Sequence, residues 1–152
     1  MIGLDTNVVV HYLTQDDAVQ SAKATELFER GLSEAEPGFV SVVAMVETAW
    51  ILERVYSLSG EELAAAIERM LGVNVLIVES EQEIFSAMIA VKEGRGSFAD
   101  ALIGALGAKV GCSHTVTFDQ KALRLSNFQP YDPARGTHRK RNLYDRRQRS
   151  GR

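Results

Sequence analysis

The chain has 152 residues, of which 45% are hydrophobic and 24% are charged, and its formal net charge is −3. This size and composition predict one domain that can bury a core without disulfide bonds or a structural metal. No apolar run reaches the roughly eighteen residues of a membrane helix, and the amino terminus lacks the basic segment of a signal peptide. The lone Cys112 has neither a disulfide partner nor zinc-ligand neighbours. We therefore expect a soluble protein of the reducing cytoplasm, with no contact to a membrane.

The charge is distributed unevenly along the chain. Residues 134–152 carry eight Lys and Arg side chains against the single acid Asp145, a formal charge of +7, so the other 133 residues sum to −10. Apolar periodicity also disappears beyond Pro130 and Pro133. We predict a folded domain over residues 1–131 and a basic tail, disordered in isolation, over residues 132–152. The sequence leaves open whether the tail binds RNA nonspecifically, folds on an acidic partner or is a solvated extension.

Strand-like and helix-like segments alternate along the domain. This alternation predicts an α/β fold in which a mainly parallel sheet is covered by helices on both faces. We predict short strands at residues 2–5, 38–41, 74–78 and 114–117, with a weak edge strand at 127–130. Helices are predicted at residues 6–14, 16–31, 42–57, 59–72, 80–93, 97–111 and 119–126. Asp16 is the candidate N-cap of the helix at 16–31. Ser59 and Glu62 have the spacing of a capping box at the start of the helix at 59–72.

Four carboxylates, far apart in the chain, fall where a parallel fold would bring them to one edge of the sheet: Asp5, Glu47, Asp100 and Asp119. Asp5 and Asp119 come directly after strand-like segments, and ligands bind beyond the carboxyl ends of the strands in open α/β sheets. Each of these two acids also has an ordinary interpretation as a helix N-cap, because a short carboxylate satisfies free N–H groups in the first turn.

The other two acids lie on predicted helices. Asp100 stands three residues after Ser97, so it either reaches back to the Ser97 N–H as a variant capping box or contributes to a site. Glu47 lies inside the most apolar helix, where an unpaired buried charge is costly, so a metal or charge partner explains it better than a solvated stripe. The four acids together favour a divalent-cation site, with Mg²⁺ or Mn²⁺ as the expected ion for hard oxygen ligands.

The segments around these acids resemble the four acidic motifs of PIN-domain ribonucleases, and particularly the VapC toxins of bacterial toxin–antitoxin modules. The motifs are Ile2-Gly3-Leu4-Asp5-Thr6-Asn7, Ser41 with Glu47, Ser97-Phe98-Ala99-Asp100-Ala101-Leu102, and Thr117-Phe118-Asp119. The resemblance covers about residues 1–130, and only the basic tail departs from the usual compact length. It implies a three-layer α/β/α sandwich with a central, mainly parallel sheet of four to five strands.

The resemblance also implies an activity, which is Mg²⁺-dependent hydrolysis of RNA phosphodiester bonds, with Mn²⁺ as an alternative ion. Asp5, Asp100 and Asp119 would hold the metal, and Glu47 would complete the site or orient the attacking water. Thr6 and Thr117 would support the carboxylates, and Asn7 would contact metal-bound water or substrate, although capping or strand polarity explains these three equally well. Ser41 is a weaker candidate.

Binding of RNA and proteins is the second expectation. An acidic site does not attract a polyanion, so basic residues must supply phosphate contacts; the candidates are Arg95, Lys121 and Arg124, each of which is also explained as solvated surface charge. The family resemblance implies a homodimer and a VapB-like antitoxin. Apolar contacts for such partners are offered by Trp50, Ile51, Val55 and Leu58, unless these pack in the core.

Other functions stay open to different degrees. A PIN-domain nuclease that matures RNA outside a toxin–antitoxin module is the main alternative. A noncatalytic receiver-like signalling module is disfavoured, because it needs an acidic pair after its first strand and a phosphoacceptor Asp after a middle strand. A haloacid-dehalogenase-type phosphatase lacks its second acid, since Asp5 is followed by Thr6-Asn7. Which RNA is cleaved, and where, is not readable from the sequence.

Overall fold

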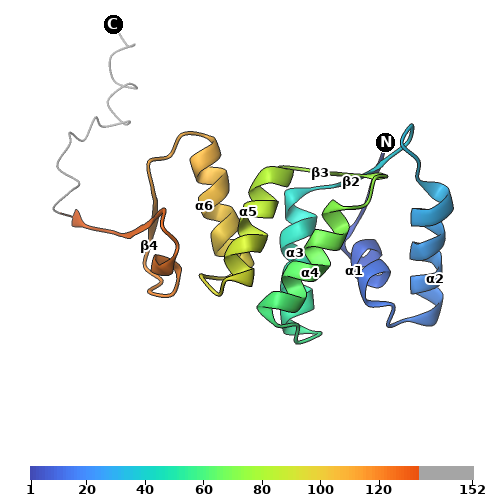
Figure 1. Cartoon of the computed structure of the whole chain (residues 1–152), viewed down its shortest axis with the longest axis horizontal. Helices are drawn as coiled ribbons and strands as arrows, with labels where there is room; N and C mark the ends of the chain where they lie inside the picture. The colour runs from blue at the N-terminus through green and yellow to red at the C-terminus, as the bar shows by residue number, and fades with distance from the viewer. Residues whose placement is uncertain (134–152) are drawn as a thin grey trace, which may run out of the picture.

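The computed structural model describes residues 1–133, which contain six α-helices and five short strands. Figure 1 shows the helices and strands in chain order, and the tail predicted at residues 132–152 lies almost entirely outside the described residues. The elements are β1 (Ile2–Gly3), α1 (Thr6–Thr14), α2 (Ala18–Glu26), the π-helical turn η1 (Leu27–Gly31), β2 (Gly38–Val40), α3 (Val42–Arg54), α4 (Gly60–Leu71), β3 (Leu76–Val78), α5 (Glu81–Lys92), α6 (Phe98–Lys109), β4 (Thr115–Thr117), the 3₁₀ turn η2 (Ala122–Arg124) and β5 (Phe128–Pro130).

The strands form two separate parallel sheets, not one. The first sheet has the order β1-β2-β3, in which Gly3, Phe39 and Ile77 lie side by side. The second pairs β4 with β5, with Thr115 opposite Phe128. The α/β class and the parallel pairing are confirmed, but the expected four to five strands are divided between two sheets. The division arises because α6 packs against α5, so the chain delivers β4 to a place away from β1.

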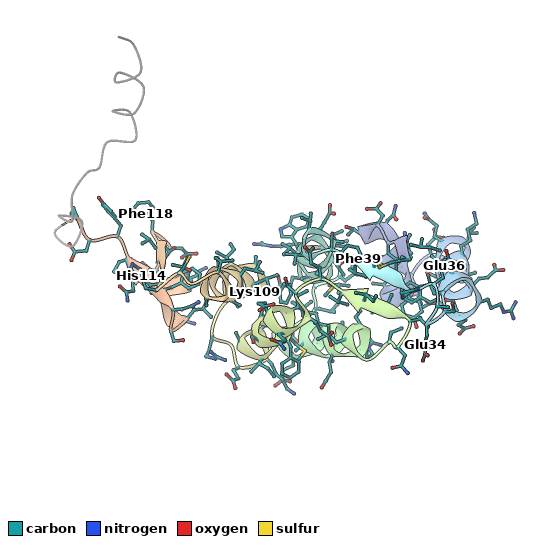
Figure 2. All side chains as sticks on the ribbon, turned by 90° about the horizontal axis from the view of Figure 1, so that it is seen from above. Glu34, Glu36, Phe39, Lys109, His114 and Phe118 are labelled. Atoms are coloured by element: carbon teal, nitrogen blue, oxygen red, sulfur yellow. The ribbon has the colours of Figure 1, made fainter. Side chains whose placement is uncertain are left out.

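The molecule is elongated. Figure 1 shows α2 at one end, β4 at the other, and α3, α4, α5 and α6 between them. Figure 2 shows the same separation from above, with Phe118 and His114 at one end and Glu34 and Glu36 at the opposite one. Within residues 1–133, no helix combines the length and the apolar character that crossing a bilayer requires.

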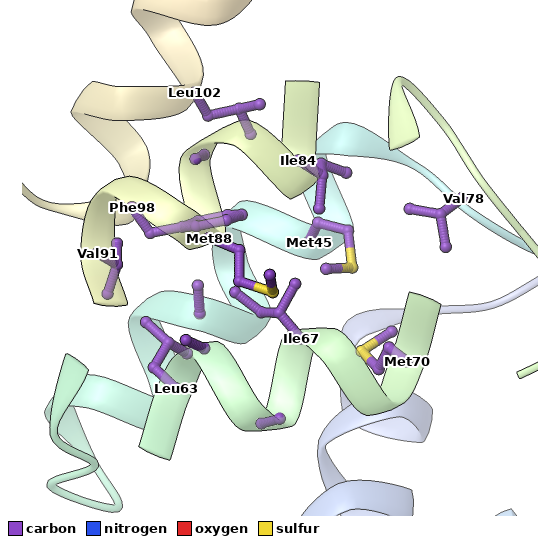
Figure 3. Close-up of a cluster of buried hydrophobic side chains, with 14 of the residues drawn as sticks. Met45, Leu63, Ile67, Met70, Val78, Ile84, Met88, Val91, Phe98 and Leu102 are labelled. Carbon is purple, nitrogen blue, oxygen red and sulfur yellow. The ribbon is translucent and has the colours of Figure 1, made fainter. Parts of the chain in front are cut away.

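The core is continuous across the helices, as the close-up in Figure 3 shows. Methionines from three helices meet in it: Met45 of α3, Met70 of α4 and Met88 of α5 are all fully buried. Phe98 at the start of α6 and Leu102 one turn later enter the same cluster. This packing anchors α6 to the helices before it, and so determines where Asp100 lies.

The capping box predicted at the start of α4 is present in the structure. The Ser59 N–H donates to Glu62 Oε2 at 2.7 Å, and the Glu62 N–H donates to Ser59 Oγ at 3.2 Å, which confirms the capping box. The prediction of Asp16 as an N-cap is wrong, because the cap of α2 is Asp17, whose Oδ1 accepts the N–H groups of Val19 and Gln20.

The helix predicted at 119–126 is also wrong, since only the turn η2 forms there. Only Ala122–Arg124 are helical in this connection, and the rest of it returns the chain so that β5 can pair in parallel with β4.

Candidate active site

Two of the predicted acids are joined through one threonine. Asp5 follows β1 and caps α1, because its Oδ1 accepts the backbone N–H of Thr6 at 2.9 Å. Thr6 is buried, and its Oγ1 donates to Glu47 Oε2 at 2.6 Å. The Asp5 segment and Glu47, which come from the first strand end and from α3, therefore meet across 41 positions of sequence. We call Asp5, Thr6 and Glu47 the threonine bridge.

The surroundings of Glu47 differ from the expectation. Its side chain is exposed, while Met45, Thr48 and Ala49 on the other side of α3 are buried. The premise that Glu47 is a buried charge is wrong, because α3 presents this position to solvent. Exposure and the hydrogen bond from Thr6 account for the carboxylate without a charged partner, and they leave Glu47 Oε1 available to other groups.

Asp100 lies in the first turn of α6 and is half-buried. Its N–H donates to Ser97 Oγ at 3.1 Å, and its Oδ2 accepts the Ser97 hydroxyl at 2.7 Å. The acid thus bonds with the cap, through the Ser97 hydroxyl and not through the Ser97 N–H that a capping box would use. These hydrogen bonds are local, and they do not connect Asp100 to the threonine bridge.

Asp119 follows β4 and is exposed. Its Oδ1 accepts the N–H of Lys121 at 2.8 Å, and its own N–H donates to Thr117 Oγ1 at 3.0 Å. Thr117 therefore supports the backbone of Asp119 and not the carboxylate. Because Asp119 follows Phe118, it lies at the opposite end of the molecule from the sheet that contains β1 (Figures 1 and 2).

The donor chemistry suits a hard divalent cation, but the arrangement in one chain does not complete a site. Within residues 1–133, no group of three or more His, Cys, Asp or Glu side chains is placed to hold a metal ion. Carboxylate oxygens are the ligands that Mg²⁺ and Mn²⁺ prefer. One chain brings Asp5 and Glu47 together through Thr6 and leaves Asp119 at the far end, so the predicted quartet does not fit the ion within a single copy.

The remaining candidates are on the surface. Asn7 is exposed on the first turn of α1 and lines a depression of about 220 Å³ together with Val8, His11, Gln20, Lys23, Ala24 and Leu27. Ser41 caps α3 through a hydrogen bond from the Ala44 N–H at 3.2 Å. Asn7 is therefore the candidate with access to a ligand, while Ser41 has a structural role.

The three predicted RNA contacts differ in whether their side chains are already engaged in an ion pair. The Arg95 Nε donates to Glu93 Oε2 at 2.6 Å, and both side chains are partly exposed. Lys121 and Arg124 are exposed and make no ion pair with the described residues. These two are the better placed for phosphate, and both lie beside Asp119.

Two acids outside the quartet have specific partners that the sequence reading missed. Glu79 follows β3 as Asp5 follows β1, and its Oε2 accepts the Val42 N–H at the start of α3 at 2.8 Å. Its place at a strand end was a signal that could have found it. Asp16 accepts hydrogen bonds from Tyr56, Thr14 and His11, and the Tyr56 hydroxyl is the main reason that the pKa of Asp16 lies well below its ordinary value.

Two comparisons with known proteins bear on the site. A family model described as PIN domain matches residues 2–127, which include β1, the threonine bridge, Asp100 and Asp119. No curated protein matches the sequence.

Proposed function

Because the chain belongs to the PIN domain family, whose members are generally nucleases, we propose that it is a Mg²⁺-dependent endoribonuclease that hydrolyses RNA phosphodiester bonds. The observation that carries this proposal is the threonine bridge. It holds two carboxylates beside the carboxyl end of β1, where ligands bind in α/β folds. Both acids are exposed, so a polymeric substrate can reach them.

Each residue of the bridge has a separate task in this proposal. Thr6 donates to Glu47 Oε2 and so orients the carboxylate, which keeps Oε1 free to accept a proton or a hydrogen bond from the attacking water. Asp5 uses Oδ1 for the Thr6 N–H, and its Oδ2 would be the oxygen offered to the metal. Mg²⁺ belongs to the proposal because the acids offer hard oxygen donors, and Mn²⁺ is the alternative ion.

The test measures RNA cleavage by the purified full chain with Mg²⁺, with Mn²⁺ and with a chelator, and maps the new RNA ends. We expect Asp5→Asn to reduce cleavage by at least about 100-fold, more than the loss of an outer hydrogen bond causes. Asp17→Asn is the matched control, because Asp17 also caps a helix but lies outside the threonine bridge. Full activity in Asp5→Asn, or metal-independent cleavage by the wild type, would contradict the proposal.

We further propose that the enzyme is a VapC-like toxin of the reducing cytoplasm, with a VapB-like antitoxin as its partner. The support is an exposed apolar surface at the end of α3, where Trp50 is 56% exposed and Val55, the residue after the helix, is 65% exposed. Ile51 and Leu58 are half-buried, and Leu58 packs against the core. Exposed aromatic and aliphatic groups of this kind suit an amphipathic helix of a partner.

Growth of the host decides between a toxin and an RNA-processing nuclease. Induced expression of the wild type is expected to arrest growth, whereas Asp5→Asn is not. Unimpaired growth with active enzyme would reject the toxin and favour the processing role.

A further inference from the structure

Each of the two sheets has two outer strands in the described residues, β1 and β3 in the first sheet and β4 and β5 in the second. Among these four open edges, those of β1 and β4 are the two that lead directly into a predicted acid, Asp5 and Asp119. The edges of β1 and β4 also carry exposed apolar side chains, since Ile2 is 37% exposed and Val116 is 49% exposed. An unpaired strand edge presents free N–H and C=O groups, which readily pair with another chain.

The backbone directions at these edges match. The N–H groups of Ile2 and Leu4 point toward β2, where they donate to Pro37 O at 2.9 Å and Phe39 O at 2.8 Å. Because successive residues of a strand alternate, the polar groups of Gly3 point to the open edge. On β4 the Thr115 N–H donates to Asn127 O at 2.7 Å, so the polar groups of Val116 point outward in the same way.

Parallel pairing then permits a specific register. A residue that points across a parallel junction bonds with the residues on either side of its partner. Gly3 set opposite Thr117 would bond with Val116 of β4 and with Phe118, the residue that follows β4. This register brings Ile2 level with Val116, and it brings Asp5 level with Asp119.

Closure of β4 onto β1 within one chain is opposed by the packing of the second sheet. The β4–β5 pair is fitted to α6, because a Cβ on Gly104 would lie 2.5 Å from Asn127 Nδ2 and 2.7 Å from Phe128 Cε2. α6 is in turn tied to α5, since Lys109 Nζ donates to Glu83 Oε2 at 2.9 Å and to Ser80 Oγ at 3.1 Å. These elements form one packed block, and the block holds β4 away from β1 (Figure 1).

The charges at the two edges are complementary. The end of β1 carries Asp5, and Thr6 holds Glu47 of α3 close to it, whereas the end of β4 is followed by Asp119 and by the exposed cations Lys121 and Arg124. Two cations that arrive with the third acid reduce the repulsion among carboxylates.

We propose that a second copy of the chain supplies β4 to β1, with Gly3 opposite Thr117 of the partner subunit, so that Asp119 of the partner subunit stands beside Asp5. A two-fold exchange of this kind is self-complementary and produces two equivalent sites. The inference rests on the proposed function, because it names the missing contributor to that nuclease site. It also explains why one copy brings together only part of the predicted quartet.

The first test does not depend on activity. In a Cys112→Ser background, chains with Ile2→Cys are co-expressed with chains that carry Val116→Cys, and disulfide formation is followed by mass spectrometry. We expect a covalent dimer of twice the 16.7 kDa chain mass, and light scattering of the wild type should give the same doubled mass. The control replaces Val116→Cys with Val19→Cys, an exposed position on α2, and should yield no such dimer.

Three outcomes of this test would overturn the proposal. One is a wild-type monomer, which would leave the β1 edge to another protein. Another is a dimer in which the two cysteines do not react. The last is a disulfide within one chain when Ile2→Cys and Val116→Cys are placed together, which would show closure in the same copy.

The second test asks whether the two copies share a site. Asp5→Asn and Asp119→Asn chains are co-expressed with different tags and compared with each variant alone. If the sites are shared, each mixed dimer contains one intact site, so an equal mixture should recover roughly one quarter of wild-type activity. Sites formed within one chain would recover none. If the wild type does not cleave RNA, the proposed function fails, and the disulfide test still decides the strand exchange.

Discussion

The two halves of the predicted acid quartet differ in the range of their contacts. Asp5 and Glu47 are connected through Thr6 over 41 positions, whereas the carboxylates of Asp100 and Asp119 bond with groups no more than three residues away. A long-range contact can form only after the fold has brought two elements together. A local cap forms wherever its own helix or turn forms. An acid that only caps its own helix is therefore positioned by that helix. A site that needs several ligands also requires a neighbouring element that places the other ligands close to it.

The largest effect on stability is expected at the core residue that anchors α6, the helix that carries Asp100. Phe98 is fully buried at the start of α6, two residues before Asp100. Phe98→Ala should lower the free energy of unfolding by about 3–5 kcal/mol, because it leaves a cavity among the helices. Urea denaturation measures the change. Ile103→Ala on the same helix is the control, since Ile103 is exposed and its truncation should cost about 0.5 kcal/mol or less. Equal losses in both variants would show that α6 is not held by this packing.

The next effect concerns the threonine bridge. Thr6→Val keeps the shape of the side chain but removes the donor to Glu47 Oε2, and it should reduce RNA cleavage by about 10–100-fold. Thr6→Ser retains the hydroxyl and should retain most of the activity. Initial rates under saturating metal decide the comparison. Wild-type activity in Thr6→Val would mean that Glu47 does not need orientation.

Replacement of Thr48, next to Glu47, is expected to raise stability instead of lowering it. Its Oγ1 is buried and has no hydrogen-bond partner among residues 1–133. Thr48→Val should therefore raise the free energy of unfolding by about 1 kcal/mol, because it removes an unpaired polar group. A clear loss of stability would reveal a partner for this hydroxyl.

A change of similar size is expected at the cap of α6. Ser97→Ala removes the acceptor for the Asp100 N–H and the donor to its carboxylate, and should cost about 1 kcal/mol of stability. Ser59→Ala at the start of α4 is a comparable cap on a helix without a predicted site residue, and it should cost about the same. If only Ser97→Ala also lowers RNA cleavage, Asp100 contributes to the site as well as to its helix.

The smallest effect on stability is expected at acidic pH, where the end of α1 meets the end of α3. The Tyr56 hydroxyl, followed by Thr14, holds the pKa of Asp16 well below its ordinary value of 3.8. The ionised form is thus favoured in the folded chain, and its contribution is present above pH 3.8 and is lost as the pH falls further. Tyr56→Phe should weaken this acid dependence, which thermal melts from pH 5 downward would measure. An unchanged pH profile would argue against the Tyr56 contact.

Much of the fold was readable because its signals are local. The caps at Ser59 and Ser97 and the helix of residues 6–14 depend on side chains within a few positions, so the sequence pattern predicts them. The division of the sheet was not readable, since the place of β4 relative to β1 depends on where α6 packs. The assignment of Asp16 failed for the same reason, because its main partner, Tyr56, is 40 positions away.

The site was predictable to a smaller extent. The placement of Asp5 and Asp119 after strands followed from apolar runs that end in an acid. The exposure of Glu47 did not, because a helix that is apolar on most sides does not reveal which side faces solvent until its neighbours are known. Thr6 was expected to support a carboxylate and does so, although it supports Glu47 from the distant helix and not an acid of its own segment.

One feature of the second sheet bears on how far such a protein can associate. Pro130 ends β5 and is paired with Thr117, and proline has no backbone N–H to offer to a further strand. The outer side of β5 is therefore a poor template for growth, while the β4 side stays available. Addition of a further strand beyond β5 is accordingly disfavoured at that proline.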